Sequence, residues 1–137
     1  MILREITLKN FLVFYGEQSL SFPCDGDQNV TLILANNNTG KTSLIRALKF
    51  LFYGSRSLAS GSGGGQPSSV INERAANEAD LGEDVEGCVE LTFILGEDRY
   101  RFRRSVLAAR SESGLGRGDE KLSQLVLADD RVQRILD

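Results

Sequence analysis

The segment Ala35–Thr42 reads ANNNTGKT and ends in a glycine, a lysine and a hydroxyl residue in succession. The pattern G-x-x-x-x-G-K-[S/T] is typical of loops that bind the phosphates of a nucleotide. Gly40, Lys41 and Thr42 satisfy this pattern, whereas Ala35 stands at its first glycine position. We therefore predict a phosphate-binding loop here; the alternative is a polar turn that contains a lysine by chance.

Each residue type in this loop has a physical task. Backbone N–H groups and the positive end of the following helix would form a cavity for a polyphosphate. Lys41, the candidate catalytic residue, would bridge the β- and γ-phosphates, and the hydroxyl of Thr42 would ligate Mg²⁺. Gly40 would leave room for a phosphate oxygen, and Asn38 would tolerate a left-handed backbone. The candidate nucleotide-binding residues are Asn36, Asn37, Asn38, Thr39, Gly40, Lys41, Thr42 and Ser43.

Such a loop must lie between a strand and a helix, and the sequence predicts both. The run VTLIL at Val30–Leu34 is almost continuously apolar, as in a strand covered on both faces. Lys41–Tyr53 has helical periodicity, and Gly54 stands where a C-terminal cap glycine is expected. The residues predicted to share the buried face of this helix are Leu44, Ile45, Leu48, Leu51 and Phe52.

Alternation of apolar and polar residues predicts several further strands. Ile2–Phe11 and Gln18–Phe22 are the first two predicted strands, and Leu122–Leu127 is a later one. In Val85–Phe93 the apolar side chains alternate with Glu86, Cys88, Glu90 and Thr92, and the residues 96–98 supply a turn into an arginine-rich strand. This pattern predicts an antiparallel hairpin with one solvated face.

Two segments between these elements have a different composition. Ser55–Ser69 is rich in glycine and serine, and we interpret it as a mobile surface loop. Ser111–Gly118 is a second loop of this kind. At the end of the sequence, Asp129 or Asp130 is a candidate cap for a helix that runs to the last residue, as expected for part of a longer protein.

Arginines and aromatic residues each allow two interpretations. The strand Arg99–Arg104 either contacts DNA phosphates or pairs with Glu86 and Glu90 on the opposing strand, and we favour the ion pairs. Phe11, Phe14 and Tyr15 either shape a nucleotide pocket or pack at the end of a strand. We favour packing for these aromatic side chains.

Composition excludes several classes of function. The chain has 137 residues, 41% of them hydrophobic and 26% charged, which indicates one globular domain. Histidine is absent, which excludes histidine-based acid–base catalysis and histidine-ligated zinc. Two cysteines do not make a disulfide framework, and the charged N-terminus is no secretory signal, so we expect a cytoplasmic protein without membrane contact. The net charge of −3 is not that of a polycation made for nucleic acid.

The strings LKNFLVFYGEQSLSF and NNNTGKTSLIRALKFLFYG resemble the N-terminal lobe of SMC-type, ABC-like P-loop ATPase heads. The order of these motifs is most similar to DndD-like ATPases and related DNA-repair and phage-defence AAA ATPases. Val70–Asn72 and the later string VELTFILGEDRYRFRR are also similar to that lobe. The resemblance covers most of the chain.

The resemblance implies an α/β P-loop NTPase fold in which a central sheet carries the phosphate-binding loop and its helix beside an antiparallel β subdomain. Residues 1–137 would be the N-terminal part of an ATPase head: strands, loop and first helix in 1–54, a flexible loop in 55–69, and in 70–137 a hairpin region leading to a helix.

The resemblance also implies ATP and Mg²⁺ as ligands and several partners. These are the C-terminal half of the same head, a second head that sandwiches ATP in a homodimer, and DNA. The head would couple ATP hydrolysis and dimerisation to DNA binding in repair or phage defence. The sequence contains no apolar strand that ends in Asp-Glu, so we expect this chain alone to hydrolyse ATP hardly at all.

Two other functions compete with this hypothesis. One is a nucleotide-independent interaction module that retains the P-loop fold, which Ala35 would favour. The other is a stand-alone P-loop kinase or GTPase. That enzyme would need a second, aspartate-containing motif that the sequence does not show, and we rank it lower.

Overall fold

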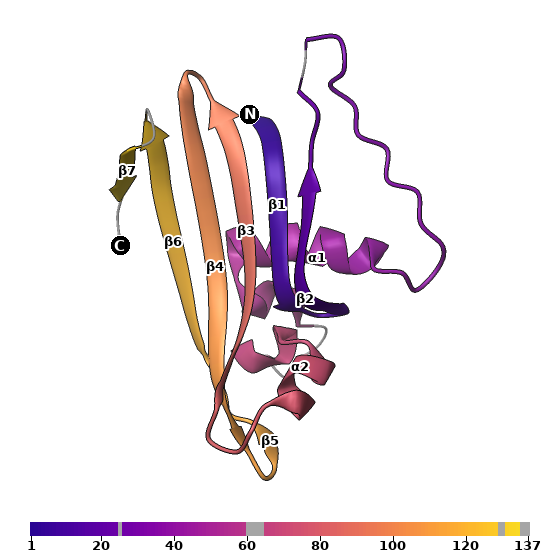
Figure 1. The fold of residues 1–137 in the computed structure, drawn as a ribbon, viewed down its shortest axis with the longest axis vertical. Helices are drawn as coiled ribbons and strands as arrows, with labels where there is room; N and C mark the ends of the chain where they lie inside the picture. The colour runs from indigo at the N-terminus through magenta and orange to yellow at the C-terminus, as the bar shows by residue number, and fades with distance from the viewer. Residues whose placement is uncertain (25, 60–64, 129–130, 135–137) are drawn as a thin grey trace.

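The computed structural model describes residues 1–24, 26–59, 65–128 and 131–134, with side chains up to Gln124. Its main feature is one antiparallel sheet with the strand order β2-β1-β3-β4-β6-β7, in which a short strand, β5, pairs with β4 (Figure 1). The strands are β1 Ile2–Phe11, β2 Phe14–Ser21, β3 Asp84–Leu95, β4 Asp98–Ser111, β5 Gly114–Leu115, β6 Asp119–Ala128 and β7 Arg131–Arg134.

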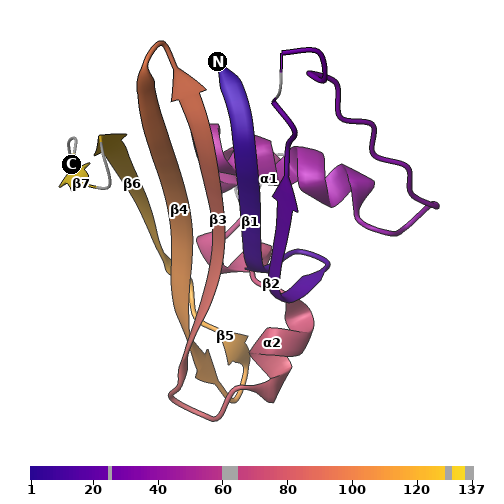
Figure 2. The ribbon, with the colours of Figure 1, turned by 45° about the horizontal axis from the view of Figure 1, so that its top comes forward.

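The helices lie together on one face of this sheet (Figure 2). They are the α-helices α1 Lys41–Tyr53 and α2 Glu73–Glu78 and the 3₁₀ helices η1 Ser55–Leu58 and η2 Pro67–Val70. The helix predicted at Lys41–Tyr53 is confirmed residue for residue. It ends at Gly54, which has a φ of 83° and donates its N–H to the carbonyl of Phe50 at 2.8 Å.

The hairpin of β3 and β4 builds much of the core. The two strands pair from Asp84↔Ala109 to Leu95↔Asp98, so the turn is the dipeptide at 96–97, one residue shorter than predicted. The predicted apolar face is confirmed, because Val85, Val89, Leu91 and Phe93 are all buried. Phe11 on β1 and Phe50 on α1 join the sheet to the helix, with ring centroids 5.2 Å apart.

The buried face of α1 differs from the predicted one. Ala47 and Phe50 are fully buried, whereas Ile45 is 70% exposed and Phe52 is 40% exposed. The helix packs on the sheet through the side that carries Ser43, Ala47, Phe50 and Leu51. The predicted apolar face and the observed buried face therefore overlap only in part. The outer side of α1 exposes the apolar residues Ile45, Phe52 and Tyr53 next to the cations Arg46 and Lys49.

The predicted strand at Val30–Leu34 is not formed. This segment runs as extended chain beyond β2 (Figure 1), and Val30, Leu32 and Leu34 are 81%, 78% and 84% exposed. A strand needs a hydrogen-bonding neighbour, and no strand within the described ranges pairs with this segment. The structure is therefore a mainly antiparallel sheet with two α-helices, and the phosphate loop does not follow a sheet strand.

The remaining predictions have mixed outcomes. The strands predicted at Gln18–Phe22 and Leu122–Leu127 correspond to β2 and β6, each of which begins earlier than expected. The ends of the predicted loop at 55–69 form η1 and η2, in which Ser55 and Ser68 are buried, while 60–64 lie outside the described residues.

Two further elements depart from the sequence analysis. A short strand, β7, occupies Arg131–Arg134, where a helix was predicted; Asp129 and Asp130, its candidate caps, lie outside the described residues. The helix α2 was not predicted at all. None of the helices in the described ranges has the length and apolarity needed to cross a membrane.

Candidate functional site

The predicted phosphate loop is a tight turn that leads directly into α1. Asn38 has a φ of 64° and Gly40 a φ of 106°, so both lie in the left-handed region. The left-handed backbone expected at Asn38 is confirmed. Thr39 donates its hydroxyl to the carbonyl of Asn36 at 2.5 Å, which closes the turn.

The N-terminus of α1 is open. The first hydrogen bond within the helix runs from the N–H of Leu44 to the carbonyl of Gly40, at 2.9 Å. The N–H groups of Lys41, Thr42 and Ser43 therefore have no partner within the helix. No side chain of the described residues caps this end, and its first turn contains no acidic residue. Three N–H groups and the positive end of the helix dipole are thus available to an anion.

These N–H groups border a cavity of about 520 Å³. Lys41 and Thr42 are exposed and Ser43 is buried. Six of the eight predicted nucleotide-binding residues line the cavity. The other two are Asn36 and Thr39, and the hydroxyl of Thr39 is used within the turn. The lining residues are Val13, Asn37, Asn38, Gly40, Lys41, Thr42 and Ser43. A lysine, two hydroxyls and unpaired N–H groups are the donors that a polyphosphate with Mg²⁺ requires, so the residues present fit these ligands.

The turn between β1 and β2 contributes Val13 to the lining of this cavity. A Cβ at Gly40 would lie 2.9 Å from Cζ of Phe14 and 3.3 Å from Cγ2 of Val13. Gly40 is therefore required by the packing of this turn as well as by its own backbone. Val13 carries no local signal of a lining residue, because its contact with the loop joins segments far apart along the chain.

The sequence model of an AAA domain family matches residues 5–136. The chain belongs to this AAA domain family. Its members are AAA-type P-loop ATPases that are found in SMC-like proteins, and membership makes the chain a nucleotide-binding ATPase domain that uses ATP. Among curated proteins, none matches the chain.

The aromatic residues near the loop of the AAA domain have packing roles. Phe11 is fully buried in the core, and Phe14 lies against Gly40. The side chain of Tyr15 lies against α2, where its hydroxyl donates to Glu78. Cζ of Arg74 lies over the ring of Tyr15, 4.2 Å from its centroid. The hydrogen bond to Glu78 raises the pKa of Tyr15 above its usual value. Packing, the favoured interpretation, is thus what the structure shows.

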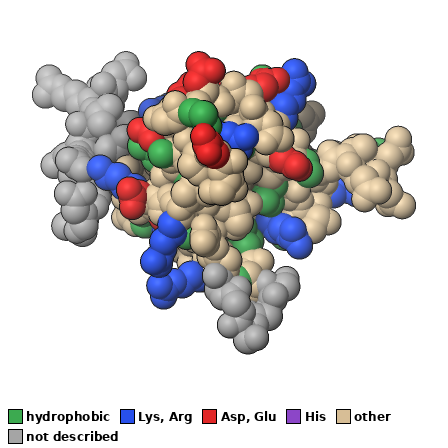
Figure 3. Space-filling model, turned by 90° about the horizontal axis from the view of Figure 1, so that it is seen from below, with side chains coloured by type: hydrophobic (Ala, Val, Ile, Leu, Met, Phe, Trp, Pro, Cys, Tyr) green, Lys and Arg blue, Asp and Glu red, His purple; other side chains and the backbone are tan. Residues whose placement is uncertain are grey.

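The arginine strand of the AAA domain is paired with carboxylates. Nη2 of Arg103 lies 2.6 Å from Oε1 of Glu86, and Nε of Arg101 lies 3.4 Å from Oε1 of Glu90. The favoured interpretation of this strand as one of ion pairs is therefore confirmed. The face is less solvated than predicted, because Cys88, which was expected on it, is only 5% exposed. On the face seen from below, acidic and basic side chains are also interspersed (Figure 3).

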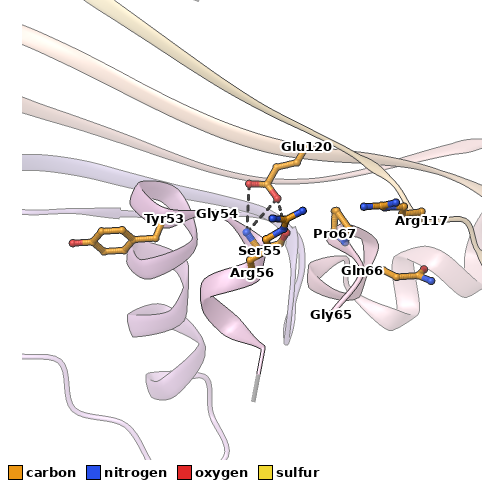
Figure 4. A pocket seen from close by; sticks show the side chains of 9 residues that line it. All are labelled: Tyr53, Gly54, Ser55, Arg56, Gly65, Gln66, Pro67, Arg117 and Glu120. Atoms are coloured by element: carbon orange, nitrogen blue, oxygen red, sulfur yellow. Dashed lines mark hydrogen bonds between the residues drawn. The ribbon is translucent and has the colours of Figure 1, made fainter. Parts of the chain in front are cut away.

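A larger cavity, about 730 Å³, lies at the other end of α1 and includes Gly54, Arg56, Arg117 and Glu120 in its lining (Figure 4). Its carboxylate, Glu120, accepts from the hydroxyl of Ser55 at 2.5 Å and from Arg104 at 2.6 Å. Burial alone would raise the pKa of Glu120, but the hydrogen bonds from Ser55 and Arg104 outweigh burial and lower it. This cavity is separated from the phosphate loop by the length of α1, about 20 Å at 1.5 Å per residue.

Proposed function

We propose that the AAA domain binds Mg-ATP at the loop Asn36–Ser43. The observation that carries this proposal is the uncapped N-terminus of α1, which opens into a cavity that Lys41 and Thr42 line. The negative charge of a triphosphate would interact favourably with the positive end of the helix dipole, which no acidic side chain in the first turn offsets. The N–H groups of Lys41, Thr42 and Ser43 would then donate to its oxygens.

Three side chains of the loop have separate roles toward the nucleotide. The ammonium of Lys41 extends from an exposed position at the cavity and neutralises the terminal phosphates. The hydroxyl of Thr42 would hold Mg²⁺, which when bound would offset charge on the β- and γ-phosphates. Ser43 is only 8% exposed and lines the same cavity, so its hydroxyl would contact the α-phosphate.

A second lobe completes the site. Val30–Leu34 immediately precedes the loop and exposes apolar side chains on an unpaired backbone. Ile45, Phe52 and Tyr53 extend this apolar surface along the outer side of α1. Strands of the C-terminal half of the same head would pair with Val30–Leu34 and cover α1, because exposed apolar area of this extent is stabilised by burial.

The complete assembly is an SMC-like head. Two heads would enclose ATP between them as a homodimer, and hydrolysis would open them and change their grip on DNA. The resemblance of the sequence to SMC-type heads and the occurrence of this family in SMC-like proteins support this proposal. A role in DNA repair or phage defence follows from the same resemblance. Sedimentation of the complete head with and without Mg-ATP tests the proposed homodimer. A head that stays monomeric with ATP contradicts it.

The binding of a fluorescent ATP analogue tests the proposed site. We expect Mg²⁺-dependent binding to this chain and stronger binding when the complementary lobe is present, since that lobe orders the segment before the loop. Lys41→Ala should abolish the signal in both. If neither preparation binds, the proposal fails, and a nucleotide-independent interaction module takes its place.

A further inference from the structure

The turn that forms the wall of the nucleotide cavity has an unfavourable backbone. Asn10 and Leu12 have φ angles of 44° and 47°, on either side of Phe11, which is fully buried. Asparagine tolerates this conformation because its short polar side chain can hydrogen-bond to nearby backbone. For leucine the conformation costs on the order of 1–3 kcal/mol and persists only where neighbouring groups enforce it.

Those neighbouring groups belong to a segment 60 residues later in the chain. The N–H of Leu12 donates to the carbonyl of Val70 at 2.7 Å, and Nδ2 of Asn72 donates to the carbonyl of Leu12 at 2.7 Å. The N–H of Asn72 donates to the carbonyl of Asn10 at 2.8 Å. Both backbone groups of Leu12 are thus bonded to Val70–Asn72, which holds the residue in its left-handed conformation.

Asn72 is specifically suited to this contact. Its side chain is enclosed, since the residue is 7% exposed, and both of its polar atoms are used. Oδ1 accepts from the N–H of Ala75 at 3.1 Å and caps α2, while Nδ2 donates to Leu12. A buried carbonyl that loses such a donor is costly to leave unpaired, so Leu12 would have a reason to move if the amide were absent.

A shift of Leu12 would displace the wall of the nucleotide cavity. Val13 follows Leu12 directly and lines the cavity, and Val13 and Phe14 bracket Gly40 of the phosphate loop. We propose that Asn72 is a positioning residue for the nucleotide: its amide fixes Leu12, and Leu12 fixes the wall that Val13 presents to the bound phosphates. This inference rests on the proposed function, because it assigns a role toward the same site.

The substitution Asn72→Asp removes the amide donor and places a carboxylate oxygen, which repels the carbonyl of Leu12, in its position. Aspartate caps a helix as well as asparagine does, so the bond from Ala75 is kept, but a carboxylate cannot donate to the carbonyl of Leu12. We expect the affinity of Asn72→Asp for Mg-ATP to fall about tenfold. A control variant of similar stability should keep an affinity close to that of the wild type. Ala76→Gly is the matched control, because it weakens α2 by a helix-interior glycine without touching Leu12.

A second readout follows the turn itself. Hydrogen exchange of the Leu12 N–H should be slow in the wild type and in Ala76→Gly, and faster in Asn72→Asp. Leu12→Gly in the Asn72→Asp background should restore part of the lost affinity, because glycine adopts a positive φ without strain. Should Asn72→Asp not fold, Asn72→Ser replaces it, since serine caps the helix but its side chain is one bond shorter.

The outcomes separate this inference from the proposed function. If the wild type does not bind Mg-ATP either alone or with the complementary lobe present, the proposed function fails. If the wild type binds, Lys41→Ala does not, and Asn72→Asp binds as tightly as Ala76→Gly, the site stands and the role of Asn72 is wrong. Weaker binding together with faster exchange at Leu12 supports the inference.

Discussion

Nη1 of Arg104 lies 2.6 Å from Oε1 of Glu120, and Nε of the same guanidinium donates to the carbonyl of Leu51 at 2.9 Å. Glu120 in turn accepts from the hydroxyl and N–H of Ser55 (Figure 4). The last turn of α1 is thereby anchored to β4 and β6, with a cation near its negative end. The helix is fixed at its C-terminus, while its N-terminus remains open for an anion.

Arg104→Ala should lower the free energy of unfolding by about 2–3 kcal/mol, because it removes two charge-assisted hydrogen bonds and leaves Glu120 largely buried without its cation. The two side chains are only 14% and 18% exposed, so solvent cannot replace the pair. Urea unfolding measures the change. Arg99→Ala, at an exposed position of the same strand, should change stability by less than about 0.5 kcal/mol. Equal effects of the two substitutions would refute the anchoring role.

The stability of the fold should depend on pH through Glu120. Its folded-state pKa lies below the ordinary value of 4.5. The ionised carboxylate therefore stabilises the fold above pH 4.5, and this contribution is lost as the pH falls through the folded-state pKa. Glu120→Gln should be less stable than the wild type at pH 7, and the difference should shrink in acid. A difference that stays constant with pH would contradict this assignment.

Gly40→Ala should be costlier than an alanine at another left-handed glycine. At Gly40 the new Cβ strains a φ of 106° and meets Cζ of Phe14 at 2.9 Å. Gly82, with a φ of 82° and nothing within 4 Å, is the control for backbone strain alone, at about 1 kcal/mol. Thermal unfolding should rank Gly40→Ala below Gly82→Ala, and nucleotide binding should be lost only in the former. Equal stability of the two variants would mean that Phe14 moves aside without cost and would contradict this prediction.

Asn38 should tolerate glycine and reject valine. Its φ of 64° is available to glycine without strain, whereas a β-branched side chain there costs on the order of 1–2 kcal/mol. Asn38→Gly should bind a fluorescent ATP analogue as the wild type does, and Asn38→Val should bind it more weakly. If both variants bind equally, the left-handed turn is not needed for the nucleotide site.

Local patterns in the sequence were sufficient for the elements whose partners are near in the chain. The alternation in β3 and the two-residue turn before β4 define a hairpin without distant information. The bounds of α1 follow from its periodicity and from Gly54. The acids Glu86 and Glu90 also identified the pairing of the arginine strand, because side chains on adjacent strands face each other at matching positions.

Elements that depend on distant partners were missed or misplaced. Val30–Leu34 has the composition of a buried strand, but composition does not supply the neighbour that such a strand must bond to. The buried side of α1 was set by the sheet rather than by its most apolar stripe, so Ile45 and Phe52 were placed wrongly. Asn72 carried one local signal, a helix cap before α2, yet its bond to Leu12 spans 60 residues.

The most direct test of the nucleotide site is a calorimetric titration of Mg-ATP into the wild type, Lys41→Ala and Lys49→Ala. Lys41 borders the cavity, whereas Lys49 is an exposed lysine farther along the same helix and controls for loss of positive charge. We predict that the wild type and Lys49→Ala bind, that Lys41→Ala does not, and that omission of Mg²⁺ weakens binding. Equal binding by all three proteins, or by none, would contradict the assignment of Asn36–Ser43 as the nucleotide site.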